Sequence, residues 1–205
     1  MSITKTTAQS GSTPSDTKAH LLATGYQLIA QKGFTAVGIK QILDCAGVPK
    51  GSFYHYFASK EAFGAAIIEH YFTHYRQGLD TIEAQHINAQ QKLYNYFQNW
   101  YDTQQNGCDH EKCLVVKLSA EVADLSEPMR KALYAGYQQT ISWLAKQIKA
   151  GWADNSVPPL NNIAAESMAK RWYFAWLGAS LIAKISQTNT PLAEVWQMTT
   201  TEMGR

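Results

Sequence analysis

Cysteine is scarce in this sequence of 205 residues: there are three, an odd number, which argues against a secreted scaffold held by paired disulfides. Long apolar runs are also missing, and no stretch approaches the ~18 uninterrupted apolar residues that a membrane-spanning helix needs. Residues 1–16 contain no apolar segment that would indicate a secretory signal, and their Ser, Thr, Gln and Gly favour a flexible arm. We therefore expect a cytoplasmic protein with reduced thiols and no membrane contact.

Charge is sparse as well, since charged residues make up only 17% of the chain and the formal net charge is +2. The charge is unevenly distributed. Residues 1–60 hold six lysines against two aspartates, a net +4, and residues 61–205 hold the other 12 basic and 14 acidic side chains, a net −2. A basic front on a slightly acidic body is typical of DNA-binding regulators.

What the sequence does contain is helical periodicity. Apolar residues make up 45% of the chain, enough for a core, and they recur at helical spacing, whereas no run alternates as a strand would. Asp16 or Thr17 would cap the first helix, and Gly33 stands where it should end. The sequence therefore predicts an all-α fold, with helices over residues 17–32, 39–46, 49–58, 60–84, 89–105, 113–125, 126–152, 162–186 and 191–202.

Two short expected helices, 39–46 and 49–58, are joined by a turn that contains Gly47, and this is the plan of a helix-turn-helix. Gly47 suits the left-handed conformation that the turn needs. In this plan the N-terminal residues of the second helix enter the major groove of double-stranded DNA. Lys60 would add a positive charge at the start of the next helix, where a phosphate binds well.

Aromatic residues in the second helix divide into two groups at helical spacing. Phe53, Tyr56 and Phe57 are expected to close a three-helix core, whereas Tyr54 and His55 point elsewhere and are expected to face DNA. The residues predicted to contact DNA are Thr17, Lys40, Lys50, Gly51, Ser52, Tyr54, His55 and Lys60.

Segment 42–61, ILDCAGVPKGSFYHYFASKE, resembles the DNA-binding signature of the TetR family of transcriptional regulators. The resemblance implies an all-helical homodimer, in which a small domain over residues 17–62 binds a palindromic operator. A larger domain over residues 63–205 would sense an effector and form the dimer through its last two long helices. Gly38 departs from the family pattern, because many members carry a Ser or Thr there that caps the helix and touches phosphate.

Segments 113–133 (CLVVKLSAEVADLSEPMRKAL) and 176–186 (WLGASLIAKIS) resemble a TetR-family repressor that senses electrophiles and oxidants through a cysteine. The resemblance implies that Cys113 is the sensing residue and that Lys184 is its candidate partner. Cys113 also begins an expected helix, where the helix dipole favours the thiolate that reacts with quinones, enals and hypochlorous acid.

Oxidation of such a thiol gives sulfenic acid, which a nearby amine or thiol can trap. Lys184 is a candidate amine, although a lysine near a helix end is often only exposed. Cys108 is either a resolving thiol or an inert loop cysteine, and a disulfide between subunits also stays open. Cys45 is expected to be a small filler residue.

Residues 108–110 together with Cys113 offer ligands that zinc accepts, but their spacing fits no common site and no fourth ligand is evident. We therefore expect neither a metal nor a cofactor. The alternative to cysteine chemistry is an apolar aromatic ligand bound non-covalently in a helical pocket. The residues predicted to line it, unless they are simply core, are Trp100, Tyr101, Tyr137, Trp172 and Trp176.

Nothing in the sequence indicates an enzyme, since no Ser-His-Asp arrangement, phosphate-binding glycine loop or convincing acid pair is present. Glu121 and Asp124 lie three residues apart on one helix, which a solvated face or a helix-end salt bridge explains. A purely structural adaptor would not explain why basic charge gathers with a helix-turn-helix. We therefore expect a DNA-binding repressor, with activation left open, in which the helix over 60–84 carries a conformational change to the DNA-binding domain.

Overall fold

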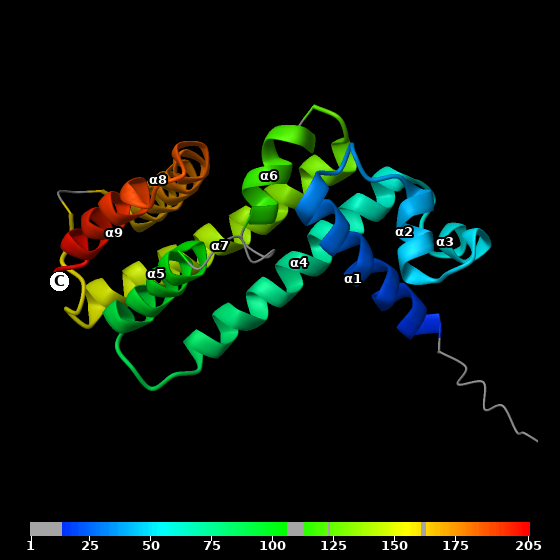
Figure 1. Cartoon of the computed structure of the whole chain (residues 1–205). Coiled ribbons are helices and arrows are strands. Elements are labelled where there is room, and N and C mark those ends of the chain that lie inside the picture. The colour runs from blue at the N-terminus through cyan, green and yellow to red at the C-terminus, as the bar shows by residue number, and fades with distance from the viewer. Residues whose placement is uncertain (1–13, 106–112, 123, 161–162) are drawn as a thin grey trace, which may run out of the picture.

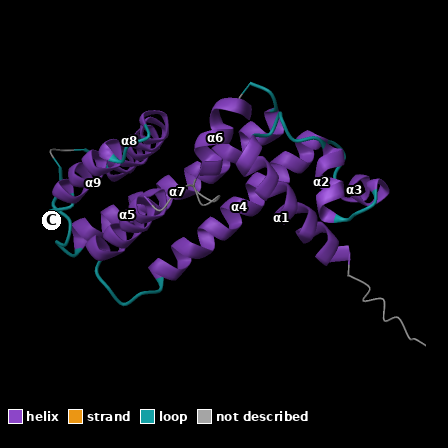
Figure 2. Cartoon of the chain, in the orientation of Figure 1, coloured by secondary structure: helices purple, strands orange, loops and turns teal. Residues whose placement is uncertain are grey.

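The computed structural model describes residues 14–105, 113–122, 124–160 and 163–205. Within these residues all regular structure is helical, which confirms the predicted all-α class (Figures 1 and 2). None of the described helices has the length and apolar character needed to cross a bilayer. The helices are α1 (Pro14–Lys32), α2 (Ile39–Ala46), α3 (Lys50–Tyr56), α4 (Lys60–Glu83), α5 (Ala89–Gln105), α6 (Cys113–Val122), α7 (Glu127–Ala153), α8 (Ala165–Ser186) and α9 (Thr190–Glu202).

Helix ends differ from the prediction in a few places. α1 begins at Pro14 rather than at Asp16 or Thr17, so neither of these residues is its cap. α6 ends at Val122 rather than Leu125, because the chain turns there and leaves the Leu125 side chain 59% exposed. α8 begins three residues later than expected, at 165.

α3 also ends earlier than predicted, at Tyr56. Phe57 takes an extended conformation (φ −135°, ψ 121°) and donates its N–H to the carbonyl of Phe53. The bend carries the Phe57 ring inward, and only 4% of the residue stays exposed. Leaving the helix therefore allows this ring to join the core, as the aromatic spacing predicted.

Apolar side chains form two separate clusters. The front cluster joins α1, α2, α3 and the first half of α4 to α6 and the start of α7. The rear cluster joins the end of α4, α5, the rest of α7, α8 and α9. α6 thus packs with the helix-turn-helix end of the molecule (Figure 1). Fully buried members of the front cluster include Leu21, Ile42, Phe53, Phe63, Ile68, Leu118, Val122 and Met129.

α4 and α7 run through both clusters and pack against each other. Their approach is close at Gly136 of α7, where an added Cβ would lie 2.1 Å from the Phe72 ring of α4. Near the end of α4, Glu83 accepts hydrogen bonds from Lys146 (2.7 Å) and Gln147 (2.5 Å) of α7. The hydrogen bond from Lys146 lowers the pKa of the Glu83 carboxyl, which favours the charged form in this contact.

The α4–α7 contact can be tested with two glycine substitutions. Gly136→Ala should lower the free energy of unfolding by about 1–3 kcal/mol, because the new methyl group overlaps the buried Phe72 ring. Gly78→Ala on α4 makes the same change where nothing lies within 4 Å. It should raise stability by about 0.5–1 kcal/mol through helix propensity alone. Urea unfolding at one fixed protein concentration measures both, and equal midpoints would contradict the packing described here.

Candidate functional site

The predicted helix-turn-helix is present and its turn has the expected geometry. Gly47 ends α2 in the left-handed conformation (φ 64°, ψ 29°) and its N–H bonds to the carbonyl of Leu43. A second tie comes from α1, where Nε2 of His20 donates to the carbonyl of Ala46 at 3.0 Å. His20 was not predicted to take part, since no local spacing relates it to a residue 26 positions away. The turn is thus held both by its own backbone and by α1.

α3 presents the side chains that were predicted to face DNA. Phe53 and Phe57 are buried at 0% and 4% exposure, whereas Tyr54 is 49% exposed and His55 is also exposed. The ammonium group of Lys50 lies 5.9 Å from the centre of the Tyr54 ring, so the two share one face. A cation beside aromatic groups on the outer face of the second helix provides hydrogen-bond donors and charge for a nucleic acid.

Four of the other residues predicted to contact DNA lie on α1, α2 and α3. Lys40 on α2 and Gly51 on α3 are exposed, Ser52 is half-buried, and Thr17 is half-buried in the first turns of α1. These three helices, α1, α2 and α3, lie together at one end of the molecule (Figure 1). The contact of these residues with DNA stays a prediction.

Lys60 occupies the start of α4, as predicted. Ser59 caps this helix by accepting a hydrogen bond from the N–H of Ala62 at 3.1 Å. A hydrogen bond from its own backbone N–H, and then one with Ser59, lower the pKa of Glu61, so a carboxylate lies beside Lys60. The Lys60 ammonium lies 4.5 Å from the centre of the Phe34 ring. This cation–π contact holds the lysine at the helix N-terminus.

Gly38 precedes α2 and supplies no side-chain cap, which confirms the departure noted in the sequence. Its backbone is extended (φ −87°, ψ 153°), a conformation that any residue adopts. An added Cβ would meet nothing within 4 Å. The position therefore has room for the capping side chain that this chain lacks.

Glu121 near the end of α6 makes a long-range contact that sequence analysis missed. Its carboxylate accepts from the N–H of Phe34 at 2.9 Å and from the N–H of Thr35 at 2.6 Å. These two N–H groups belong to the connection between α1 and α2. The Glu121 carboxylate therefore bonds to another segment of the chain and does not lie on a purely solvated face, whereas Asp124 is exposed just beyond the end of α6.

The residues predicted to sense an effector are only partly described. Cys113 is the first residue of α6, and its side chain lies outside what the structure describes, as does the whole of Cys108. Residues 109 and 110, considered for zinc, lie outside the described residues too. Lys184 is exposed in the last turn of α8, and α8 contacts α6. The helices that carry Cys113 and Lys184 are therefore neighbours.

The aromatic residues predicted to line a ligand pocket lie in or beside the rear cluster. Trp100, Trp172 and Trp176 are buried, and the rings of Trp100 and Trp176 are 5.5 Å apart. Half-buried Tyr101 stacks on Trp196 and half-buried Tyr137 on Tyr173. In this structure these residues form part of the core, and their role in binding a ligand stays a prediction. A groove of about 590 Å³ lies instead between α4 and α7, and none of these five residues lines it.

α8 carries an exposed apolar stripe. Phe174 and Leu181 are 53% and 44% exposed, and Ile182 and Ile185 are 50% and 69% exposed. The sequence predicted dimerisation through the last two long helices, but Phe174, Ile182 and Ile185 were not singled out for it. α8 is apolar on several sides, so periodicity alone does not show which side is buried within one chain.

Two family models match the chain. Residues 21–67 match "Bacterial regulatory proteins, tetR family", and residues 89–199 match "Tetracyclin repressor-like, C-terminal domain". The chain is 42% identical over 184 residues to the HTH-type transcriptional repressor NemR of Escherichia coli (strain K12), covering 88% of this chain and 90% of NemR. It is 30% identical to the HTH-type transcriptional repressor DhaR of Mycobacterium sp. (strain GP1), covering 85% and 86% of the two chains.

Solved structures agree with these matches. The crystal structure of E. coli NemR in its reduced form is similar with a TM-score of 0.83 and 41% identity, covering 89% of this chain and 94% of that one. The regulatory protein TetR from Rhodobacter sphaeroides is similar with a TM-score of 0.78 and 27% identity, covering 90% and 97%. The similarity extends through both clusters, because it covers most of each chain.

The uncapped start of α2 gives a testable prediction. Gly38→Ser should raise the free energy of unfolding by a few tenths of a kcal/mol, because the serine hydroxyl can accept an unpaired N–H of the first turn. Gly38→Ala is the matched control and should instead lower stability by about 0.5 kcal/mol. Urea unfolding compares the variants. If the alanine protein proved as stable as the serine protein, the start of α2 would not behave as an unfilled cap site.

Proposed function

Since the chain belongs to the TetR family of bacterial regulatory proteins, we propose that it is a repressor whose operator binding is relieved by modification of Cys113. In this proposal two copies of the chain bind a palindromic DNA operator in the cytoplasm. An electrophile or oxidant then reacts with the thiol, and the protein releases the DNA. The relatives are transcriptional regulators and not enzymes. In this proposal the reaction at Cys113 therefore regulates DNA binding and is not a step in a catalytic cycle.

The observation that carries the proposal is the exposed face of α3 on a fully formed helix-turn-helix. Lys50, Tyr54 and His55 project outward while Phe53 fixes the helix to the core. Lysine ammonium groups bind backbone phosphates, and the aromatic and imidazole groups can reach base edges or phosphates. The net charge of +4 over residues 1–60, from six lysines and two aspartates, supports binding to a polyanion.

A second copy of the chain explains the exposed stripe on α8. Phe174, Leu181, Ile182 and Ile185 would cost free energy if they stayed in water, and an equivalent stripe on a partner would bury them. A two-fold axis makes such a contact self-complementary. The same axis would place two α3 helices on half-sites about one turn of DNA apart, which calls for a palindrome.

Cysteine sensing is supported by the position of Cys113 at the start of α6, in a helix that contacts α1, α7 and α8. The relative NemR has been crystallised in a form described as reduced, which supports thiol chemistry in this chain as well. With an enal or quinone, the thiolate sulfur adds to the electron-poor carbon and a C–S bond forms. The resulting enolate takes its proton from water.

Hypochlorous acid would follow a different route. The thiolate sulfur takes the chlorine as hydroxide leaves, and water then replaces chloride to give sulfenic acid. The amine of Lys184 or the thiol of Cys108 can condense with the sulfenic acid, and one water molecule leaves. The contact between α6 and α8 supports Lys184 as the partner, because it brings the two helices together.

DNA binding through α3 predicts a weaker salt dependence in a charge variant. Removing the charge of Lys50 as Lys50→Gln should weaken operator binding and reduce the slope of log K against log salt by about 0.9 for each phosphate that the variant no longer neutralises. Lys149→Gln near the end of α7 removes the same charge far from the helix-turn-helix, in an exposed ion pair with Glu166, and should leave the slope unchanged. Fluorescence anisotropy over a range of salt concentrations measures both slopes. Equal slopes in the two variants would count against α3 as the DNA-contacting helix.

Sensing through Cys113 predicts that its removal abolishes the response. An enal or hypochlorous acid should weaken operator binding of the unaltered chain by about 5–150-fold, the usual range of coupling between two sites. Cys113→Ser should keep its operator affinity after the same treatment, and Cys45→Ser, at an exposed cysteine of α2, should still respond. Anisotropy with intact-mass analysis measures release and modification together. Normal release by Cys113→Ser would sink the proposal, and release by an unreactive apolar ligand would favour non-covalent sensing.

A further inference from the structure

The connection between α1 and α2 forms a small binding site for an anion. Gly33 ends α1 with a positive φ of 89° and donates its N–H to the carbonyl of Ile29 at 2.8 Å. The next two N–H groups, of Phe34 and Thr35, both bond to the carboxylate of Glu121. Successive backbone N–H groups after a left-handed residue form a concavity that suits a negative charge. Each oxygen of the carboxylate accepts one of the two hydrogen bonds.

Gly33 is required by this contact as well as by the turn. An added Cβ would lie 2.9 Å from Oε2 of Glu121, so a side chain would push the carboxylate away. The positive φ separately disfavours any other residue. Hydrogen bonds to a charged acceptor are also stronger than those to a neutral one, which favours glutamate over glutamine here. We call this contact of Glu121 with residues 33–35 the latch.

The latch holds the residue on which the front of α4 packs. Phe34 is 4% exposed, and its ring approaches α4 so closely that a Cβ on Gly64 would lie 2.7 Å from it. The same added Cβ would lie 2.6 Å from the sulfur of Met129 on α7. The ammonium group of Lys60 also lies over the Phe34 ring, 4.5 Å from its centre. Phe34 thus bonds to Glu121 through its backbone N–H, packs beside α4 in the front cluster and contacts a lysine that is predicted to bind phosphate.

We propose that Glu121 is a positioning residue that holds the helix-turn-helix in its operator-binding arrangement. The latch links α6 directly to the turn that precedes α2. Cys113 and Glu121 are eight residues apart on α6, about 12 Å at the rise of an α-helix, so a helix moved at its start also moves at its end. Withdrawal of the carboxylate would release Phe34, and with it Lys60. This last step rests on the proposed sensing at Cys113, whereas the latch itself does not.

The latch predicts that Glu121→Gln weakens operator binding before any modification. The amide keeps the size of the side chain, but its NH₂ cannot accept a hydrogen bond, so one of the two N–H groups loses its acceptor. We expect the unmodified variant to bind the operator at least about fivefold more weakly than the unaltered chain, within the usual range of such couplings. Fluorescence anisotropy measures both affinities, at a temperature where circular dichroism shows both proteins folded.

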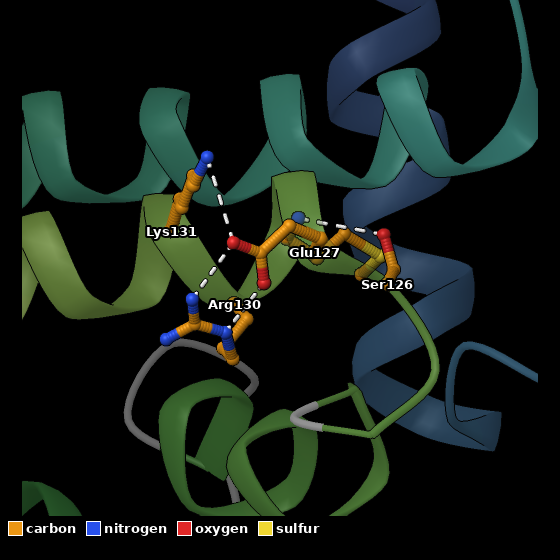
Figure 3. A network of polar contacts seen from close by, with 5 residues as sticks. Ser126, Glu127, Arg130 and Lys131 are labelled. Atoms are coloured by element: carbon orange, nitrogen blue, oxygen red, sulfur yellow. Dashed lines mark hydrogen bonds and ion pairs between the residues drawn. The ribbon is translucent and has the colours of Figure 1, made fainter.

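Glu127→Gln is the matched control. Glu127 lies just beyond the Ser126 cap of α7 and binds Arg130 at 2.7 Å and Lys131 at 3.5 Å on the protein surface (Figure 3). The Glu127→Gln substitution makes the same chemical change on the next helix, where exposed ion pairs contribute little to stability. We expect its operator affinity to be unchanged. Gly33→Ala disturbs the latch at its other partner, because the added Cβ would push the Glu121 carboxylate away. It should therefore weaken operator binding as Glu121→Gln does.

Treatment with an enal separates a latch that moves from a static support. If modification works by withdrawing Glu121, the treated chain and treated Glu121→Gln should reach the same low operator affinity. The reason is that the variant has already lost the carboxylate contact that modification would break. Equal fold-losses in both proteins would instead show independent effects and would overturn the transmission step. Unmodified Glu121→Gln that binds operator as well as Glu127→Gln would overturn the latch itself. If the enal leaves the unaltered chain bound, the proposed sensing fails, and the comparison of unmodified proteins still decides the latch.

Discussion

Two backbone N–H groups at the end of α1 depend on a carboxylate from a helix more than 80 residues later in the chain. Phe34 and Thr35 follow a helix that has already ended at Gly33, so their N–H groups need an acceptor outside α1. The N–H of Phe34 is partly buried, so leaving it unpaired would cost free energy, and Glu121 supplies an acceptor for both groups. This requirement places the end of α6 against the turn before α2, and it brings Leu118 and Val122 into the front cluster.

This arrangement makes α6 part of the DNA-binding end of the molecule. The expected route from the sensing region to DNA was the long helix α4, and α4 does extend from Lys60 into the rear cluster. α6 supplies a shorter route in our proposal, because it carries Cys113 at one end and Glu121 at the other. The two routes meet at Phe34, which contacts Glu121 through its backbone and Lys60 through its ring.

Features that depend on neighbouring residues could be read from the sequence. Gly47 adopts the left-handed conformation of the turn, and Ser59 caps α4. Tyr54 is exposed whereas the neighbouring Phe53 is buried. Local chain geometry and helical spacing decide each of these features. The latch could not be read, since the i, i+3 spacing of two acidic residues says nothing about a partner 86 positions away. The exposed stripe on α8 was missed for a related reason, because a helix that is apolar on several sides does not reveal which side its own chain covers.

The central claim is that modification of Cys113 withdraws Glu121 from the turn between α1 and α2. Amide hydrogen exchange of the full chain, with and without an enal adduct that intact mass places on Cys113, tests this most directly. The account predicts faster exchange at Phe34 and Thr35 in the adduct, while Gly33, whose N–H bonds to Ile29, keeps its rate. Unchanged exchange at Phe34 and Thr35 in a fully modified protein that has released its operator would contradict the account.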